Sequence, residues 1–177
     1  DFVQSLLEAR YKDGKPLSDE EITGIILAAL FGGQHTSAAL SAWGIIEALR
    51  NPYVLPPLLA EQDRVLGSRD HATMDDIRGM PALERLAQET ERMRPPFILL
   101  ARRVLRDFTY GKYVVPKGWM AMVSPWLSHR LPEVWRDPDR FDPDRFAAPR
   151  EEHKQFKYSM ITFGGGKHRC LGMAFGF

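Results

Sequence analysis

The longest helical pattern in the chain lies between a clear start signal and a clear stop signal. Ser18, with Glu21 three positions later, forms a capping-box pattern, and Asn51 followed by Pro52 ends the apolar-periodic run. A continuous helix over this run would measure about 48 Å at 1.5 Å per residue, long enough to cross a whole domain. Its middle contains Gly32 and Gly33, which weaken a helix by about 1 kcal/mol each relative to alanine. We therefore predict one long helix, and we expect its two glycines to serve a function that offsets their cost to helix stability.

The remaining chain is predicted to be mainly helical at first and irregular later. Apolar periodicity and proline punctuation predict shorter helices over 2–10, 53–66, 74–78 and 81–93. Residues 97–124 are rich in β-branched and aromatic side chains with glycine turns, which predicts short strands of a small sheet. Residues 125–162 are dense in Pro, Asp, Arg, Trp and Phe, a composition typical of an ordered, irregular meander. The fold class is therefore mainly α.

Composition excludes several broad classes of protein. The chain of 177 residues is 44% hydrophobic and 27% charged, as expected of a globular protein. Its formal net charge of +1, without a block of like charges, does not predict binding to nucleic acid or to an anionic membrane. A single cysteine excludes an internal disulfide framework. The longest apolar run, residues 25–31, is far shorter than the roughly 20 residues that span a bilayer, and we see no signal peptide.

The most specific segment surrounds the lone cysteine. Residues 163–172 read Phe-Gly-Gly-Gly-Lys-His-Arg-Cys-Leu-Gly, and the glycines would let the backbone approach a bulky planar group. A helix beginning at Cys170, together with the basic side chains of Lys167, His168 and Arg169, would favour the thiolate form. A cysteine thiolate is one of the few axial ligands of haem iron. One competing interpretation is a phosphate-binding glycine loop, but this segment lacks the lysine followed by serine or threonine that ends such a loop. The other is a buried cysteine beside a glycine turn.

Two further segments contain charged residues at suggestive spacings. Glu89 and Arg92 are three positions apart on one predicted helix, where they can pair with each other and with a third charged group. By itself this spacing is more often a solvated surface pair. Arg145, in the stretch Phe-Asp-Pro-Asp-Arg-Phe at 141–146, is the available third partner.

Together these segments resemble cytochrome P450. Residues 163–172 resemble the family's haem-binding signature, residues 89–92 its Glu-x-x-Arg motif, and residues 141–146 its meander motif, whose arginine completes a buried Glu-Arg-Arg network. Residues 30–37 resemble the oxygen-binding segment of the family's long central helix, with Thr36 at the threonine position. His35 stands where many members have an acidic residue, and the Gly-Gln-His-Thr-Ser setting is similar to the sterol 14α-demethylases. Glu91 departs from the motif, because the family often has an apolar residue there.

The resemblance implies a set of roles. Haem b would be the cofactor, with its iron held by Cys170. Thr36 and His35 would be catalytic. From its position alone, His35 is more simply interpreted as a polar side chain on one face of the helix. Arg102 and His168 match positions that bind the haem propionates. Arg103 is the alternative to Arg102, because a shift of one residue along a strand turns the side chain to the opposite face of the sheet. The implied cofactor-binding residues are Cys170, His168, Arg102, Phe163, Gly164 and Gly166. The implied substrate-binding residues, for which simple core packing is the alternative, are Phe31, Gly32, Phe97, Ile98 and Leu100.

The implied activity is that of a haem-thiolate monooxygenase. It would remove the 14α-methyl group of a sterol with dioxygen and electrons from a P450 reductase or a ferredoxin. The alternatives are a P450 hydroxylase of another lipid or secondary metabolite, and a haem-binding or sensing protein without turnover. We expect residues 1–177 to be the C-terminal haem-binding portion of one P450 domain, truncated at both ends and inactive alone. Localisation would be cytoplasmic in a bacterium and at the endoplasmic reticulum membrane in a eukaryote, with any anchor in a preceding part.

Overall fold

The computed structural model describes residues 1–173. The chain divides into two compact units, residues 1–39 and 40–177, and the boundary falls inside one long helix. The first unit begins with α1 (Phe2–Glu8), whose first turn is capped by the Asp1 side chain accepting from the Gln4 amide at 2.8 Å. A turn follows, held by a bridge between Arg10 and Pro16. It leads into α2 (Asp19–Arg50).

Helix α2 has the bounds that its start and stop signals predicted. The amide of Glu21 donates to Ser18 Oγ at 3.2 Å, and the amide of Ser18 donates to Glu21 Oε2 at 2.8 Å, so the capping box is confirmed. The helix continues without a break through Gly32 and Gly33 and ends at Arg50. It is also the helix, within the described residues, that by length and composition could cross a membrane, with a mean hydropathy of 1.2. Core helices of soluble proteins share that property, so it does not identify an anchor.

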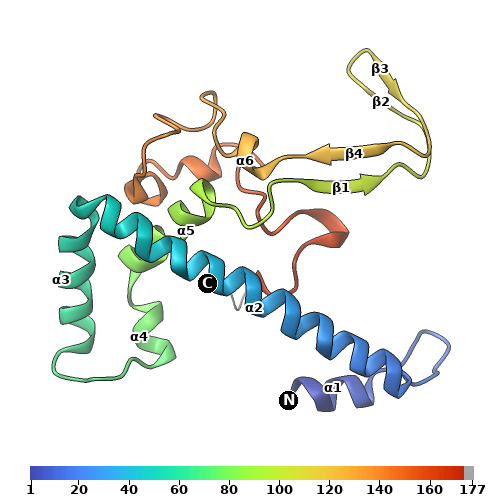
Figure 1. Cartoon of the computed structure of the whole chain (residues 1–177), viewed down its shortest axis with the longest axis horizontal. Helices are drawn as coiled ribbons and strands as arrows, with labels where there is room; N and C mark the ends of the chain where they lie inside the picture. Colours follow the sequence, from blue (N-terminus) through green and yellow to red (C-terminus); the bar gives the residue numbers. More distant parts are fainter. Residues whose placement is uncertain (174–177) are drawn as a thin grey trace. The chain divides into compact units, whose positions relative to one another are not determined.

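Three helices and a 3-10 turn follow α2 in the second unit (Figure 1). The turn (Pro52–Val54) precedes α3 (Leu55–Leu66), and α4 (Met74–Arg78) and α5 (Pro81–Met93) have the predicted bounds. The predicted helix over 53–66 is therefore split, with its first turn tighter than an α-helix. Glu61 of α3 accepts the backbone amides of Ala82 and Leu83 at 2.9 and 3.0 Å. This carboxylate satisfies free N–H groups at the start of α5 and joins the two helices.

The strands form two small antiparallel sheets instead of the single sheet that was predicted. Strand β1 (Leu100–Arg103) pairs with β4 (Met120–Val123), and β2 (Phe108–Tyr110) pairs with β3 (Tyr113–Val115). Figure 1 shows the second pair as a hairpin beyond the first. The chain leaves the first ladder after Arg103, because residues 104–107 form a bend between the two pairs. Gly111, with φ of 57°, closes the hairpin in a conformation that other residues avoid.

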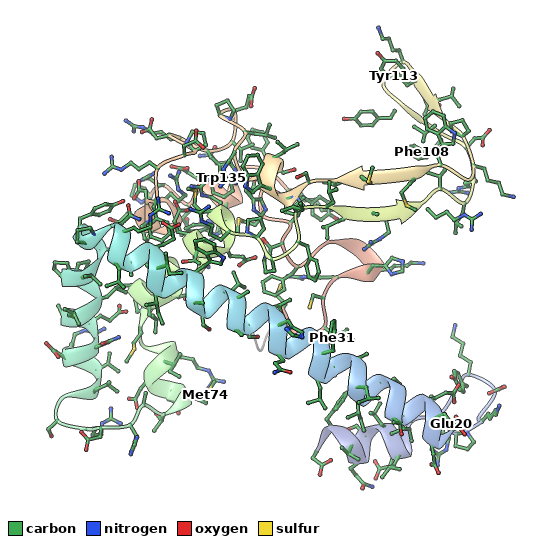
Figure 2. The ribbon with its side chains drawn as sticks, in the orientation of Figure 1. Glu20, Phe31, Met74, Phe108, Tyr113 and Trp135 are labelled. Atoms are coloured by element: carbon green, nitrogen blue, oxygen red, sulfur yellow. The ribbon has the colours of Figure 1, made fainter. Side chains whose placement is uncertain are left out.

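The last third of the chain is the predicted irregular meander. Its regular structure consists of α6 (Pro125–Ser128) and 3-10 turns η2 (Pro143–Phe146), η3 (Glu152–Lys154) and η4 (Gly166–His168). Trp135 is completely buried among these segments (Figure 2), whereas Phe108 and Tyr113 on the hairpin are exposed. The main apolar cluster joins the C-terminal end of α2, α3, α5 and the meander; its buried members are Ala48, Val54, Leu58, Leu86, Met93 and Phe141.

Candidate functional site

The loop at 163–170 is closed by its own backbone. The amide of Cys170 donates to the carbonyl of Phe163 at 2.8 Å, and the amide of Gly164 donates to the carbonyl of Ile161 at 2.8 Å. Gly164 and Gly166 have φ of 70° and 65°, in the left-handed region that side chains with a Cβ rarely adopt. The glycines are therefore required by the turn that places Cys170 opposite Phe163.

Cys170 lies at the end of this loop with an exposed side chain. The helix predicted to begin at Cys170 is described only in part: residues 171–172 form a turn, Met173 is helical, and residues 174–177 lie outside the described residues. The basic residues of the loop, including His168 in η4, are also exposed. The thiol is thus presented on a surface that also carries the basic side chains of the loop.

The donor set of the loop fits a haem and does not fit a bare metal ion. Among residues 1–173, no group of three or more His, Cys, Asp or Glu side chains is placed to hold a metal. A single thiolate needs a metal that brings its other ligands with it, as iron does in a porphyrin. Gly165 also faces the ring of Tyr158, where an added Cβ would lie 2.8 Å from the ring. Residues 164–166 therefore form a stretch of backbone without side chains, as expected beside a planar group.

The two candidates for binding the propionates lie on different elements. His168 belongs to η4, and Arg102 lies on β1 opposite Ala121 of β4. The guanidinium of Arg102 donates to the carbonyl of Ala101 at 2.8 Å and is otherwise exposed. Arg103 is the next residue of the strand, so its side chain points to the other face. The choice between Arg102 and Arg103 stays a prediction.

The predicted catalytic residues lie in the first unit. Thr36 Oγ donates to the carbonyl of Gly32 at 2.5 Å, one turn earlier in α2. The rings of Phe31 and His35 meet edge to face, with centroids 4.8 Å apart. The acceptor is a backbone carbonyl, so this hydrogen bond does not require a glycine at position 32, where an added Cβ would meet, among the described residues, no atom within 4 Å outside the helix's own backbone.

The predicted substrate-binding residues are divided between the two units, each described by itself. Phe31 and Gly32 belong to the first unit, and Phe97, Ile98 and Leu100 belong to the second. Phe31, Phe97 and Ile98 are 71%, 55% and 62% exposed, and Leu100 is half-buried. The structure thus leaves these apolar side chains available, and their role in binding a substrate stays a prediction.

The structure brings Glu89, Arg92 and Arg145 together in the interior. Arg92 binds Glu89 with two hydrogen bonds of 2.7 and 2.9 Å, and Arg145 Nε donates to Glu89 Oε1 at 3.1 Å. All three side chains are completely buried. Each arginine also donates to backbone carbonyls of the meander, including those of His129 and Arg136 at 2.7 Å. The ionic cluster consequently ties α5 to the irregular segment that leads to the cysteine loop.

Sequence reasoning missed a fourth member of this cluster. Glu152 in η3 accepts a 2.6 Å hydrogen bond from Arg145, and Arg150 binds its other oxygen at 2.6 Å. Burial by itself raises the pKa of Glu152, but the hydrogen bonds from the two arginines outweigh it and hold the pKa below its ordinary value. The missed signal is charge balance, because two buried arginines need a second buried carboxylate besides Glu89.

A buried histidine also escaped the sequence analysis. His129 is completely buried, and its Nε2 accepts the amide of Ile161 at 3.0 Å, which fixes the segment just before the loop. Burial lowers the pKa of His129 to about 4, so the ring is neutral at physiological pH. Its Nδ1 is buried without a hydrogen-bond partner in the described part of the chain. His129 therefore acts as a neutral acceptor that positions the start of the loop.

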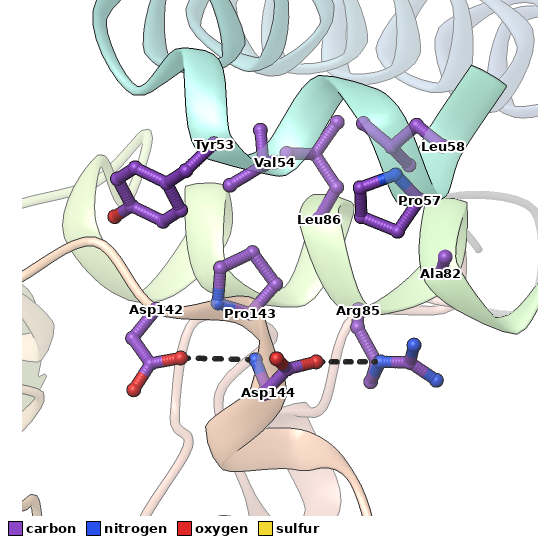
Figure 3. A pocket seen from close by; sticks show the side chains of 10 residues that line it. All are labelled: Tyr53, Val54, Pro57, Leu58, Ala82, Arg85, Leu86, Asp142, Pro143 and Asp144. Atoms are coloured by element: carbon purple, nitrogen blue, oxygen red, sulfur yellow. Dashed lines mark hydrogen bonds and ion pairs between the residues drawn. The ribbon is translucent and has the colours of Figure 1, made fainter. Parts of the chain in front are cut away.

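A shallow pocket lies between α3, α5 and η2, far along the sequence from the cysteine loop (Figure 3). Its charged side chains are Arg85, Asp142 and Asp144, and Arg85 Nε lies 3.8 Å from Asp144 Oδ1. Apolar residues such as Val54 and Leu86 form the opposite wall. None of the residues predicted for the cofactor or the substrate lines this pocket.

Comparison with known proteins identifies relatives over the whole chain. The sterol 14α-demethylase of Mycolicibacterium vanbaalenii is 38% identical over 176 residues, covering 99% of this chain and 39% of that protein. The obtusifoliol 14-alpha demethylase of Sorghum bicolor is 40% identical over 184 residues, covering 100% of this chain and 37% of that protein. Human lanosterol 14-alpha demethylase is 35% identical over 178 residues, with coverages of 100% and 35%. The chain spans less than two fifths of the length of these relatives.

A solved structure has the same fold. The retinoic acid bound cyanobacterial CYP120A1 superposes with a TM-score of 0.91 at 28% sequence identity, covering 99% of this chain and 40% of that one. The predicted fold class is thereby confirmed, as is the resemblance to sterol 14α-demethylases. The family description "Cytochrome P450" matches residues 1–177. From its fold, its cysteine loop and this match, the chain belongs to the cytochrome P450 family.

Proposed function

We propose that this chain is the haem-binding portion of a monooxygenase that oxidises the 14α-methyl group of a sterol. The observation that carries the proposal is the closed loop ending at the exposed Cys170, in a chain that the cytochrome P450 family matches throughout. The sterol is favoured because relatives named as 14-demethylases of sterols are 35–40% identical over the chain. Electrons would come from a P450 reductase or a ferredoxin.

In this proposal the residues of the loop hold the cofactor. Cys170 would ligate haem iron as a thiolate, and Phe163, Gly164 and Gly166 would form the backbone surface against the porphyrin. When bound, the haem supplies the activation of dioxygen, and thiolate ligation favours cleavage of the O–O bond. Arg102 and His168 would neutralise the two propionates, since both present exposed cationic or polar side chains.

Thr36 and His35 would transfer protons on the side of the haem where the substrate binds. The Thr36 hydroxyl donates to the Gly32 carbonyl, so its oxygen is able to accept a hydrogen bond. To donate a proton elsewhere, Thr36 must first release Gly32. The imidazole of His35 would pass a proton to the threonine and so replenish it. The apolar side chains Phe31, Phe97, Ile98 and Leu100 would exclude water and orient the sterol.

A second substrate class is favoured by one specific observation. The solved relative with a TM-score of 0.91 holds retinoic acid, an apolar lipid with a carboxylate. A lipid of this kind would need a polar partner for its carboxylate, whereas a sterol would need a mostly apolar cavity. Competition between the two lipids for the same protein would therefore separate the candidates.

The first test is thiolate ligation in the full-length gene product. We expect its ferrous carbon monoxide complex to show the shifted Soret band of a haem thiolate, and we expect Cys170→Ser to abolish that band. Lys112→Ser, at an exposed position in the β2–β3 hairpin, is the control and should retain it. A normal band in Cys170→Ser, or a folded protein without haem, would refute the proposal.

The second test addresses the substrate. Sterols with a 14α-methyl group should shift the absorption spectrum of the haem-loaded protein, and retinoic acid should compete weakly or not at all. With oxygen and reductant, the purified protein should convert the sterol into a demethylated product and formate. Turnover of retinoic acid without any spectral response to sterols would favour the second substrate class.

A further inference from the structure

Glu47 is a buried carboxylate near the end of α2 that binds the arginine at the end of α5. Its exposed fraction is 3%. Glu47 Oε1 accepts a hydrogen bond from Arg94 Nε at 2.9 Å and lies 2.8 Å from Arg94 Nη2. Its Oε2 accepts a hydrogen bond from Asn51 Nδ2 at 3.2 Å. Both oxygens are therefore engaged, as a buried carboxylate requires.

Arg94 is held both by its side chain and by its backbone. Its guanidinium carbon lies 4.6 Å from the centroid of the Trp43 ring, and Trp43 and Glu47 are four residues apart on one face of α2. The backbone amide of Arg94 donates to the carbonyl of Thr90 at 2.7 Å, in the last turn of α5. These residues all belong to the unit 40–177. Helix α2 therefore fixes the side chain of Arg94, and α5 fixes its backbone.

Arg94 is also the residue at which the chain leaves α5. Its φ of −129° and ψ of 56° are neither helical nor extended. Pro95 and Pro96 follow, and each proline ring fixes φ at about −65° and restricts the residue before it. Little freedom remains between Arg94 and residues 97–100, which we call the apolar segment. The conformation of Arg94 therefore sets the direction in which this segment leaves the helix.

The apolar segment is held at its other end through its backbone. Ser124 Oγ donates to the carbonyl of Ile98 at 2.7 Å, and Leu100 begins the antiparallel pairing of β1 with β4. The side chains of Phe97, Ile98 and Leu99 are more than half exposed. The segment thus has a fixed backbone and exposed apolar side chains, and a surface of this kind loses little conformational freedom when a ligand binds.

The ion pair is not needed to join the two helices. Ala48, next to Glu47, and Met93, next to Arg94, belong to the main apolar cluster, which packs α2 against α5. Arg94 is half-buried, so water can solvate its guanidinium when the carboxylate is removed. Loss of the pair should therefore loosen Arg94 and the apolar segment without unfolding the unit.

We propose that Glu47 is a positioning residue for the substrate: it holds Arg94, and through Arg94 it fixes the apolar segment and so helps to determine which apolar ligands fit. The proposal rests on the proposed function, in which Phe97, Ile98 and Leu100 orient the substrate. It adds to that function a determinant of specificity that acts through another side chain. A rigid sterol needs a preformed surface, so its affinity should depend on Glu47.

Amide hydrogen exchange in the full-length haem-loaded protein measures how firmly the apolar segment is held. We expect Glu47→Ala to raise the exchange rate in residues 97–103 about tenfold, because a hydrogen bond between charged groups is lost. Exchange in α5 and in the cysteine loop at 161–170 should not change. Glu47→Gln keeps the shape of the side chain and one acceptor, so it should show a smaller rise in the same direction. If Glu47→Ala does not fold, Glu47→Gln is judged by the same criteria.

Binding of a sterol with a 14α-methyl group measures the consequence for the substrate. Glu47→Ala and Arg94→Ala should each raise the Kd of the sterol about tenfold, and the double variant should raise it no further, because both changes remove the same contact. The Kd of imidazole, a ligand of haem iron without an apolar body, should not change. Arg50→Ala is the control: Arg50 Nη1 lies 3.9 Å from the same carboxylate oxygen, but its side chain is 63% exposed, so this variant should bind the sterol as the wild type does.

Two sets of results would overturn the proposal. It is wrong if Glu47→Ala leaves either the exchange of the apolar segment or the Kd of the sterol unchanged. It is also wrong if exchange rises equally in α5 and the cysteine loop, or if the affinity for imidazole falls together with that for the sterol. In those cases the ion pair would serve only the stability of the whole unit.

The measurements also separate this inference from the proposed function. A wild type that does not respond to sterols but binds retinoic acid in a manner that depends on Glu47 would refute the sterol function and keep the inference. A wild type that demethylates the sterol, with the same exchange and the same Kd in Glu47→Ala, would refute the inference alone.

Discussion

Arg145 donates a 2.6 Å hydrogen bond from Nη1 to Oε2 of Glu152, and both groups are buried in the meander. Glu152 thereby balances the charge that Glu89 alone leaves uncompensated beside Arg92 and Arg145. The cluster is neutral as a whole, which is how four ionised side chains can exist in the interior of one small unit. Its hydrogen bonds to backbone carbonyls give an irregular segment the order that a helix or sheet would otherwise supply.

Glu152→Gln should destabilise the protein strongly. The substitution leaves Arg92 and Arg145 with Glu89 as their one buried carboxylate, so the cluster carries an uncompensated positive charge, and breaking a buried ion pair typically costs about 3–5 kcal/mol. Urea denaturation should show this loss in the free energy of unfolding. Glu133→Gln, at an exposed position, is the control and should change it by less than about 0.5 kcal/mol. Equal stabilities of the two variants would mean that Arg145 is satisfied without Glu152.

His129 and Glu91 should have opposite effects on stability as pH changes. The pKa of His129 is lowered to about 4, so its contribution is present above about pH 6.5 and is lost as pH falls. The pKa of Glu91 is raised to about 7 by burial, so its contribution is present below about pH 4.5 and is lost as pH rises. Between about pH 4.5 and about pH 6.5 the two groups change the free energy of unfolding in opposite directions, so their effects on the stability of the wild type should nearly cancel.

Single substitutions should reveal the two slopes separately. In Glu91→Gln, unfolding free energy should rise by about 3 kcal/mol more than in the wild type from about pH 4 to about pH 6.5, because the titration of His129 is no longer opposed by that of Glu91. In His129→Gln it should instead fall over about the same range. Equilibrium unfolding at several pH values measures both. A variant pair with identical pH profiles would contradict the assignment.

Thr36→Ala should slow product formation while leaving the haem spectrum unchanged. Removing a group that transfers protons typically costs about 10²-fold or more in rate. Thr36→Ser keeps the hydroxyl that donates to Gly32 and should retain most of the activity. Steady-state turnover with the proposed sterol is the measurement. Full activity of the alanine variant would place proton delivery elsewhere.

The 177-residue chain by itself should associate with other copies and should not turn over substrate. Leu27, Leu30 and Phe31 of α2 are 61%, 64% and 71% exposed, and large exposed apolar surfaces drive association. Sedimentation velocity should show species larger than a monomer at micromolar concentration. A stable monomer would indicate that the exposed apolar side chains of α2 do not drive self-association.

Local signals explain which elements the sequence predicted well. Helix α2 begins after Ser18 because the capping box acts within one turn, and α5 ends before Pro95 because proline cannot continue a helix. The predictions of one helix over 53–66 and of a single small sheet were less accurate. The tighter turn at Pro52–Val54 and the bend at 104–107 depend on how neighbouring segments meet, which leaves no strong local signal.

The sequence by itself determined the spacing of the cysteine loop, the Glu-x-x-Arg pair, the long helix and hence the family, because each depends on residues close together in the chain. Only the tertiary structure decided that Glu152 completes the ionic cluster, that His129 is neutral, and that Glu91 is buried. The reason is physical. A side chain's charge state depends on which distant segments exclude water from it, and that exclusion exists only after the chain has folded.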